Sequence, residues 1–238
     1  MKIIIDVVLV LILVLCIWIG YRKGLVSGIG GLVAIAVSLY AATLFANTFS
    51  HELVPVLYPF ADGYMESLMG NEVSEKLGVK ESELSLDDYL AENPDQTEAF
   101  CTESYQAIGI YETEAKHLAE KAQDYAENNT VGIREAIVQT LCSAVAHTAI
   151  VLLGSLLILI LITAIANIPN LSFRIPNMDI LNDVGGAVAG LFRGIIFCMV
   201  LVWALMFLGI LIGKTTLDST ILARLLAKLN LLSRILGL

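Results

Sequence analysis

Four ionisable side chains lie within or directly beside long apolar stretches, where an ion is costly and often functional. They are Asp6, Arg22, Lys23 and Arg193. Asp6 comes only a few residues into its stretch, so it is either a structural anchor or part of a transport pathway. Arg193 has a long side chain that can reach the membrane interface. Arg22 and Lys23 share a short gap between two stretches, where we expect them to fix the orientation of the chain.

The other side chains that could do chemistry are scattered. His147 lies in a further apolar stretch, where it is either a packed polar group or part of a proton relay. The cysteines form neither a CxxC pair nor a disulfide framework; they are Cys16, Cys101, Cys142 and Cys198. The sequence has no nucleophile–base pair, metal-ligand cluster or nucleotide fingerprint. We therefore expect no enzymatic activity, no catalytic or metal-binding residue and no cofactor.

The composition indicates a membrane protein. Of the 238 residues, 57% are hydrophobic and only 16% are charged, against about 25% in ordinary soluble domains. Runs of about 18 or more nearly uncharged apolar residues predict membrane-spanning helices. Four such runs occur, at about Ile3–Gly20, Leu25–Ala46, Leu141–Ile168 and Gly185–Ile212. The expected fold is an all-α polytopic membrane protein with four transmembrane helices.

Most of the acidic residues fall in one segment. Residues 48–135 hold 19 acidic and 5 basic residues. Helical spacing at Pro55–Met69 and Tyr111–Asn128, with a capping box at Ser85 and Asp88, predicts a small helical domain. Its acidic surface is either ordinary solvation or a collector of cations. Nucleic acid is not an expected partner, because its phosphates would repel this surface.

These features divide the chain into four parts. Residues 1–46 form one transmembrane hairpin, 47–135 the acidic domain, 136–212 a second hairpin and 213–238 a tail. Leucines occupy one face of the predicted tail helix, and Arg224, Lys228 and Arg234 lie on the other. Such an amphipathic helix lies in the membrane interface or packs on the acidic domain.

The basic pair predicts the orientation of the spans. A four-residue loop that carries Arg22 and Lys23 is short enough to obey the positive-inside rule, which places it in the cytoplasm. The acidic domain is then extracytoplasmic. Arg174 and Arg193 agree with this orientation, whereas the basic tail opposes it. Asp183 or Asp179 is the expected partner of Arg193.

Glycines recur at every fourth position in two places. The first set is Gly20, Gly24 and Gly28, continued by Gly31; the second is Gly186, Gly190 and Gly194. Small residues at this spacing form a smooth stripe that lets two helices approach closely. We predict that the second and fourth spans pack together through these stripes, or that the stripes pack across a homo-oligomer. Gly20 and Gly24 also bracket the first turn, where Gly tolerates a positive φ.

The N-terminal stretch IIDVVLVLILVLCIWIGYRKGLVSGIGGLVAIAVSLYAA resembles the colicin V production protein family. The resemblance rests on Asp6 and on the Gly-aromatic-basic-basic-Gly turn of residues 20–24. IPNMDILNDVGGAVAGLFRGIIF, with Arg193 and Gly194, is similar to the second half of that family. The resemblance implies a multi-pass protein of the bacterial cytoplasmic (inner) membrane that is needed for colicin V export or envelope integrity. It implies nothing about the long acidic insert.

Two functions remain open from the sequence. The first is a non-enzymatic scaffold or pore-like oligomer, whose partners are the lipid bilayer, further copies of the chain and, in one version, other envelope or secretion proteins. The second is a small-solute or cation channel or transporter with an acidic collecting cap.

Overall fold

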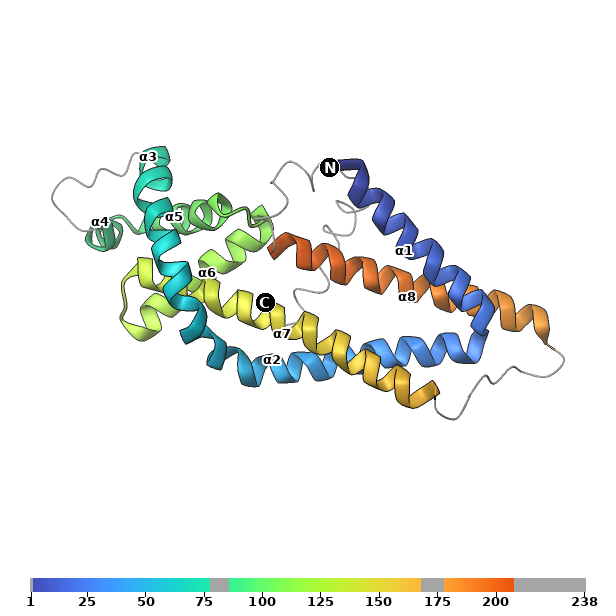
Figure 1. The fold of residues 1–238 in the computed structure, drawn as a ribbon. Coiled ribbons are helices and arrows are strands. Elements are labelled where there is room, and N and C mark those ends of the chain that lie inside the picture. The colour runs from blue at the N-terminus through green and yellow to red at the C-terminus, as the bar shows by residue number, and fades with distance from the viewer. Residues whose placement is uncertain (1, 78–85, 168–177, 208–238) are drawn as a thin grey trace. The chain divides into compact units, whose positions relative to one another are not determined.

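The computed structural model describes residues 2–77, 86–167 and 178–207, and every regular element in these ranges is helical (Figure 1). The elements are α1 (Lys2–Lys23), α2 (Leu25–Leu68), the π-helical turn η1 (Met69–Val73), α3 (Ser74–Leu77), α4 (Leu86–Glu92), α5 (Pro94–Ala107), α6 (Glu112–Asn129), α7 (Ile133–Asn167) and α8 (Asp179–Phe207). The predicted all-α class is confirmed.

Four helices are long and apolar enough to cross a membrane, namely α1, α2, α7 and α8. This confirms the four predicted spans, although their bounds differ. The third helix begins at Ile133 rather than Leu141, and the fourth at Asp179 rather than Gly185. The predicted end of the fourth span at Ile212 and the predicted tail helix lie outside the described residues.

The described residues form two compact units. The membrane unit contains residues 2–46 and 150–204, and the insert unit contains residues 47–149 together with residues 205–207. Because α2 has 44 residues, it is about 66 Å long, twice the roughly 30 Å of a hydrocarbon core. Its residues 25–46 alone span about 33 Å. The length of the helix therefore agrees with the boundary after Ala46, where the sequence also placed the end of the first hairpin.

The second boundary differs from the sequence-based one. It falls after Ala149 rather than after Glu135, because the first turns of α7 belong to the core of the insert unit. Ile137 and Val138 are fully buried there. A count of charged residues could not separate these apolar turns from the membrane-spanning part of the same helix.

The expected break in α2 is absent. We predicted one helix that ends near Ala46 and another that begins at Pro55, but α2 continues through both Pro55 and Pro59. The two prolines are four residues apart and so fall on one face of the helix, which confines the missing N–H groups to that face.

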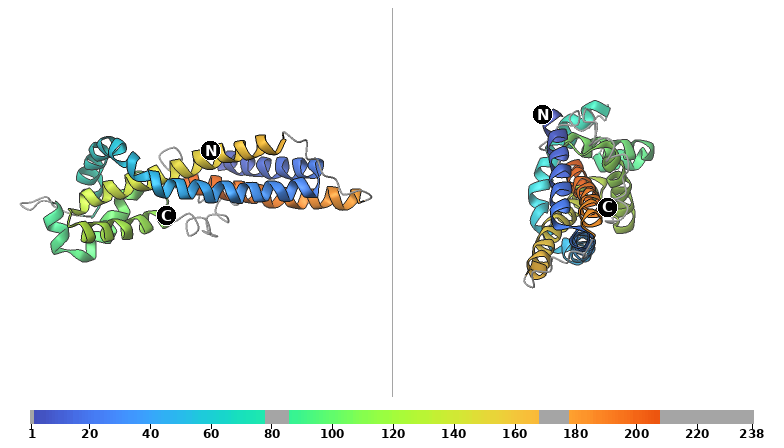
Figure 2. Two further views of the ribbon diagram at one scale, coloured as in Figure 1. Left: turned by 90° about the horizontal axis from the view of Figure 1, so that it is seen from below. Right: turned by 90° about the vertical axis from the view of Figure 1, so that its right-hand side faces the viewer.

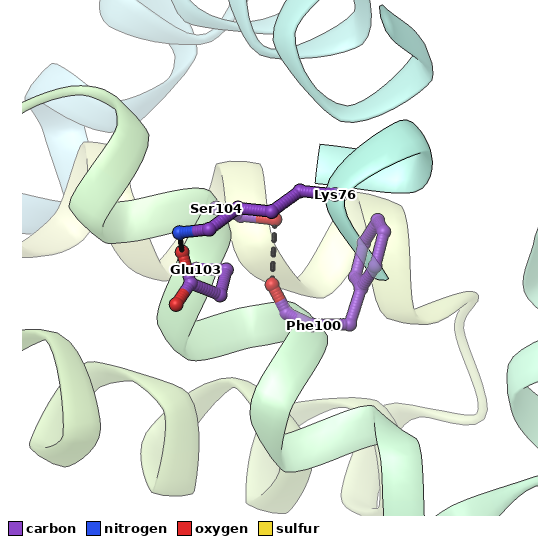
Figure 3. Close-up of polar contacts among 4 residues, drawn as sticks. All are labelled: Lys76, Phe100, Glu103 and Ser104. Atoms are coloured by element: carbon purple, nitrogen blue, oxygen red, sulfur yellow. Dashed lines mark hydrogen bonds and ion pairs between the residues drawn. The ribbon is translucent and has the colours of Figure 1, made fainter. Parts of the chain in front are cut away.

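The insert unit is built on α5 and α6, which pack along each other. Phe100 and Tyr105 are fully buried, and the Tyr105 hydroxyl donates a hydrogen bond of 3.1 Å to the carbonyl of Ile137 in α7. Lys76 and Glu103 form an ion pair that joins α3 to α5 (Figure 3). In the same helix the Ser104 hydroxyl donates a 2.8 Å hydrogen bond to the carbonyl of Phe100.

An acidic side chain caps α7. The backbone N–H of Arg134 donates a 3.1 Å hydrogen bond to Oδ1 of Asp87, which satisfies one of the donors left open at a helix N-terminus. The side chain of Arg134 also pairs with Glu66 of α2 at 2.9 Å. The predicted capping box relied on Ser85, which lies outside the described residues, and on Asp88, which is exposed.

A glycine-lined helix junction as the candidate functional site

The turn between α1 and α2 consists of a single residue. Gly24 has a φ of +82°, and its N–H donates a 3.0 Å hydrogen bond to the carbonyl of Gly20. The predicted four-residue loop is thus wrong, because Arg22 and Lys23 form the last turn of α1. Cations are favourable at this end of a helix, where the backbone carbonyls point outward. Only Gly24 needs the positive φ that we expected of the turn.

Helix α8 lies directly against α1. The two helices run antiparallel, and the right-hand view of Figure 2 draws them next to each other. The pairs that touch are Gly20 with Gly186, Cys16 with Gly190, Leu13 with Gly194 and Leu9 with Cys198. A methyl group on Gly190 would come closer to the carbonyl oxygen of Cys16 than van der Waals radii allow. The absence of side chains therefore lets the two backbones meet.

The same helix also contacts the start of α2, with which it runs parallel. A Cβ on Gly28 would lie 2.7 Å from the Cβ of Ala189, and one on Gly31 would lie 3.1 Å from Nη1 of Arg193. The junction thus joins three helices of one chain, and all seven predicted glycines border it. The contact with α1 was not predicted, because Gly20 was counted with the stripe of the second span. The contribution of these contacts to stability stays a prediction.

The sequence analysis missed Asn182. Its side chain is 1% exposed, and Oδ1 accepts a 3.3 Å hydrogen bond from the N–H of Leu25, the first residue of α2. A residue at the start of α8 therefore caps α2. Its amide nitrogen Nδ2 is buried without a hydrogen-bond partner among the described residues. Only the tertiary contact identifies this cap, since Asn182 follows Leu25 by 157 positions.

The ionisable residues differ in where they lie relative to the junction. Arg22 is exposed and lies over the ring of Trp18, 5.6 Å from its centre, and Lys23 beside it is exposed. Arg193 lies over Phe197 of its own helix at 5.4 Å, with Nε buried and without a hydrogen-bond partner in the described structure. Its expected pairing with Asp179 or Asp183 stays a prediction. Asp6 is half-buried near the far end of α1, away from the turn.

Histidine and cysteine side chains lie elsewhere. His147 is buried, and its Nε2 is 3.1 Å from Oδ1 of Asn47, as expected of a packed polar group. Cys101 is fully buried in the insert unit, and burial raises the pKa of its thiol to about 12. No group of three or more His, Cys, Asp or Glu side chains in the described ranges could hold a metal ion.

Part of the chain matches a known protein family. Residues 5–72 match the model of the family described as Colicin V production protein. The matched region contains nearly all of α1, the Gly24 turn and the whole of α2, but not α8. No curated protein and no solved structure matches the chain.

Proposed function

We propose, from the match of residues 5–72 to the colicin V production protein family, that the chain is a non-enzymatic membrane scaffold. Its role in the cell is to support export or envelope integrity from the bacterial cytoplasmic membrane. The observation that carries this proposal is the glycine-lined junction, which holds α8 against α1 and α2.

The junction favours a structural role because it is closed. Backbone touches backbone between Gly20 and Gly186, and again between Gly190 and Cys16. Such contacts leave no room for a water path between α1 and α8. These close backbone contacts favour a rigid helical framework over a water-filled pathway inside one chain.

The outward surfaces of the membrane unit suit contact with lipid and with further copies of the chain. Large apolar side chains are exposed there on α1 and α7, among them Val14, Trp18, Leu153, Leu157 and Ile160. Because the glycine stripes are occupied within one chain, a homo-oligomer would use these outward faces. Another envelope or secretion protein would meet the same surface.

A channel or transporter is the second candidate, and two buried polar groups favour it. Asn182 and Arg193 each place a nitrogen inside the membrane unit without a hydrogen-bond partner in the described part of the chain. Unsatisfied polar atoms in a membrane protein often mark a solute path. In this version the acidic insert would concentrate cations at the entrance.

Reconstitution into liposomes separates the two candidates. The scaffold predicts that proteoliposomes release potassium or a small dye no faster than protein-free liposomes do. A flux that rises with the amount of protein would favour the channel. Chemical cross-linking in the same liposomes, followed by mass determination, measures the oligomer.

Complementation tests the cellular role. The chain is expressed in a bacterium that lacks its own colicin V production protein, and colicin V export is measured. We expect Gly190→Leu to abolish rescue, because the larger side chain separates α8 from α1. Leu191→Ala is the matched control at the next position, where the side chain is already 38% exposed. Equal rescue by both variants, at equal amounts in the membrane, would contradict the role of the junction.

A further inference from the structure

The insert unit has an apolar stripe on its surface, which we call the α2 stripe. It consists of Leu53, Val56, Phe60 and Tyr64, which lie three or four positions apart and so share one face of α2. Phe60 is 79% exposed and Val56 is 61% exposed.

The exposed apolar surface of this unit is gathered on one face rather than scattered. Among the described residues of the insert unit, the other large apolar side chains that are exposed are Phe49 and Val145. Phe49 lies one turn before Leu53 and extends the α2 stripe. A contiguous apolar surface of this kind usually marks a site of interaction, whereas single exposed apolar residues need no explanation.

The charge around the α2 stripe limits what can cover it. Glu52 is exposed beside Leu53, and residues 48–135 hold 19 acidic and 5 basic residues. An anionic bilayer surface would repel such a unit, and the same unit of a second copy would repel it as well. The complementary partner is an amphipathic helix that combines an apolar face with basic residues.

The tail, which lies outside the described residues, has this chemistry in its sequence. Leucines recur at helical spacing in residues 221–236, with Arg224, Lys228 and Arg234 on the other face. Residues 213–238 hold four basic residues and one acidic residue, the reverse of the balance in the insert. The tail therefore offers both the apolar face and the charge that the α2 stripe lacks.

The order of the spans brings the tail and the insert to the same side of the membrane. Only α7 and α8 separate them among the helices that are long and apolar enough to cross, and two crossings return the chain to the side from which it started. The connection from Phe207 to Leu222 has fifteen residues and extends to about 50 Å. Such a linkage also keeps the tail at a high effective concentration near the insert.

We propose that the tail segment 221–236 docks as an amphipathic helix on the α2 stripe. Its leucines cover Val56 and Phe60, and its basic residues face Glu52 and the other carboxylates of the insert unit. Of the two positions that the sequence allows for the tail, this selects the acidic domain over the membrane interface. The inference goes beyond the scaffold role and does not depend on it.

The test measures how fast a maleimide labels Val56→Cys in a cysteine-free chain reconstituted in phosphatidylcholine nanodiscs, where both sides of the membrane are accessible. Labelling takes place only while the tail is undocked, so its rate follows the undocked fraction. Ending the chain after Gly213 should raise the rate about tenfold if the tail is docked in about nine molecules of ten. Equal rates with and without the tail would overturn the proposal.

Asn128→Cys is the matched control. Asn128 is exposed near the end of α6, away from the α2 stripe, so its labelling rate should be the same with and without the tail. If Asn128→Cys gains as much as Val56→Cys, removal of the tail has loosened the whole unit, and the proposal is overturned.

A synthetic peptide of residues 214–238 tests the contact without the linkage. Added to the shortened chain, it should slow the labelling of Val56→Cys again. A peptide with Arg224, Lys228 and Arg234 replaced by glutamine should need about ten times the concentration, because the attraction to the acidic unit is lost. Equal potency of the two peptides would overturn the role of charge in the docking.

The other possible occupants give different results. Protection of Val56→Cys that persists without the tail but disappears in detergent would assign the α2 stripe to lipid. Protection that rises with protein concentration and ignores the tail would assign it to a second copy. Either result overturns the proposal. If the shortened chain fails to fold, the full chain with Leu225→Asp and Leu229→Asp replaces it, since charges in the leucine face should release the tail.

Discussion

At the scale of single residues, the glycines of this chain differ in what surrounds them. Gly190 touches the backbone of α1, whereas Gly30 on α2 has nothing within 4 Å of the place where a Cβ would lie. In the sequence both residues are glycines within apolar helices, and nothing distinguishes one from the other. Close approach to another backbone, rather than glycine content itself, decides which of them a larger residue can replace.

Gly190→Ala should lower Tm by several degrees, because its methyl group would overlap the carbonyl oxygen of Cys16 and lie 3.1 Å from the Cα of Ile17. Backbone atoms cannot move aside without separating the helices, so we expect a cost of about 1–3 kcal/mol. Gly30→Ala is the control, and its greater helix propensity should leave Tm unchanged or raise it. Thermal unfolding in detergent measures both. A Gly190→Ala variant as stable as Gly30→Ala would show that the junction is looser than described.

Glu114 predicts a dependence of stability on pH. It is 2% exposed, and burial raises the pKa of its carboxyl above the ordinary 4.5, with Lys121 opposing the shift. The folded state then holds the proton to a higher pH than the unfolded state does. Glu114 therefore lowers stability as the pH rises above 4.5, and the loss is complete above the raised pKa.

Glu114→Gln should consequently raise Tm at pH 8, and the gain should vanish near pH 4, where the carboxyl is protonated in both states. Glu112→Gln is the control, since Glu112 is exposed and its pair with Lys116 contributes little. Thermal unfolding between pH 4 and pH 8 provides the measurement. An increase in Tm of the same size at pH 4 and at pH 8 would mean that the packing of the glutamine side chain, and not the loss of the negative charge, explains the effect.

At the scale of elements, the α1–α2 hairpin combines a one-residue turn with a basic helix end. Trp18 and Arg22 lie together beside the turn, as is common at the membrane–water interface. We expect Arg22 and Lys23 to face the cytoplasm. The expected outcome is that Lys23→Cys, in a cysteine-free background, resists a membrane-impermeant maleimide in intact cells.

Asn128→Cys should react under the same conditions, because Asn128 is exposed near the end of α6 in the insert unit. The native Cys101 is unsuitable as a reporter for this side, since it is fully buried. Labelling of Lys23→Cys but not of Asn128→Cys would reverse the assigned orientation of every span.

The basic pair itself should act through its charge. Exchanging the two residues, Arg22→Lys with Lys23→Arg, keeps both cations and should preserve insertion and export. Replacing both with glutamine should mix the orientations, because the positive-inside signal is then lost. Protease protection of the insert unit in membrane vesicles distinguishes these cases. Loss of export in the exchanged variant, with normal insertion, would point to a specific contact of Arg22.

At the scale of the whole molecule, the sequence predicted what depends on composition and missed what depends on packing. Four apolar runs and the family resemblance of the first hairpin were sufficient for the all-α membrane class. The length of α2 could not be predicted, because Pro55 and Pro59 ordinarily end a helix and here do not. The cap from Asn182 to Leu25 was equally hidden, since nothing local connects the starts of α8 and α2.

The central claim is that the glycine stripes join helices of one chain, which leaves the outward faces for partners. Cys16 and Gly194 offer the most direct measurement, because a Cβ on Gly194 would lie 3.1 Å from the Cβ of Cys16. A disulfide needs a Cβ–Cβ distance of about 3.5–4.5 Å, so a shift of about half an ångström would allow the bridge. Gly194→Cys is made in a protein that keeps Cys16 as its only other cysteine and is oxidised in the membrane. Gly30→Cys with Cys16 is the control, in which no bridge within the chain is expected. The account predicts a disulfide within a monomer for Gly194→Cys, whereas a covalent dimer through the same pair would contradict it and assign the stripes to an interface between chains.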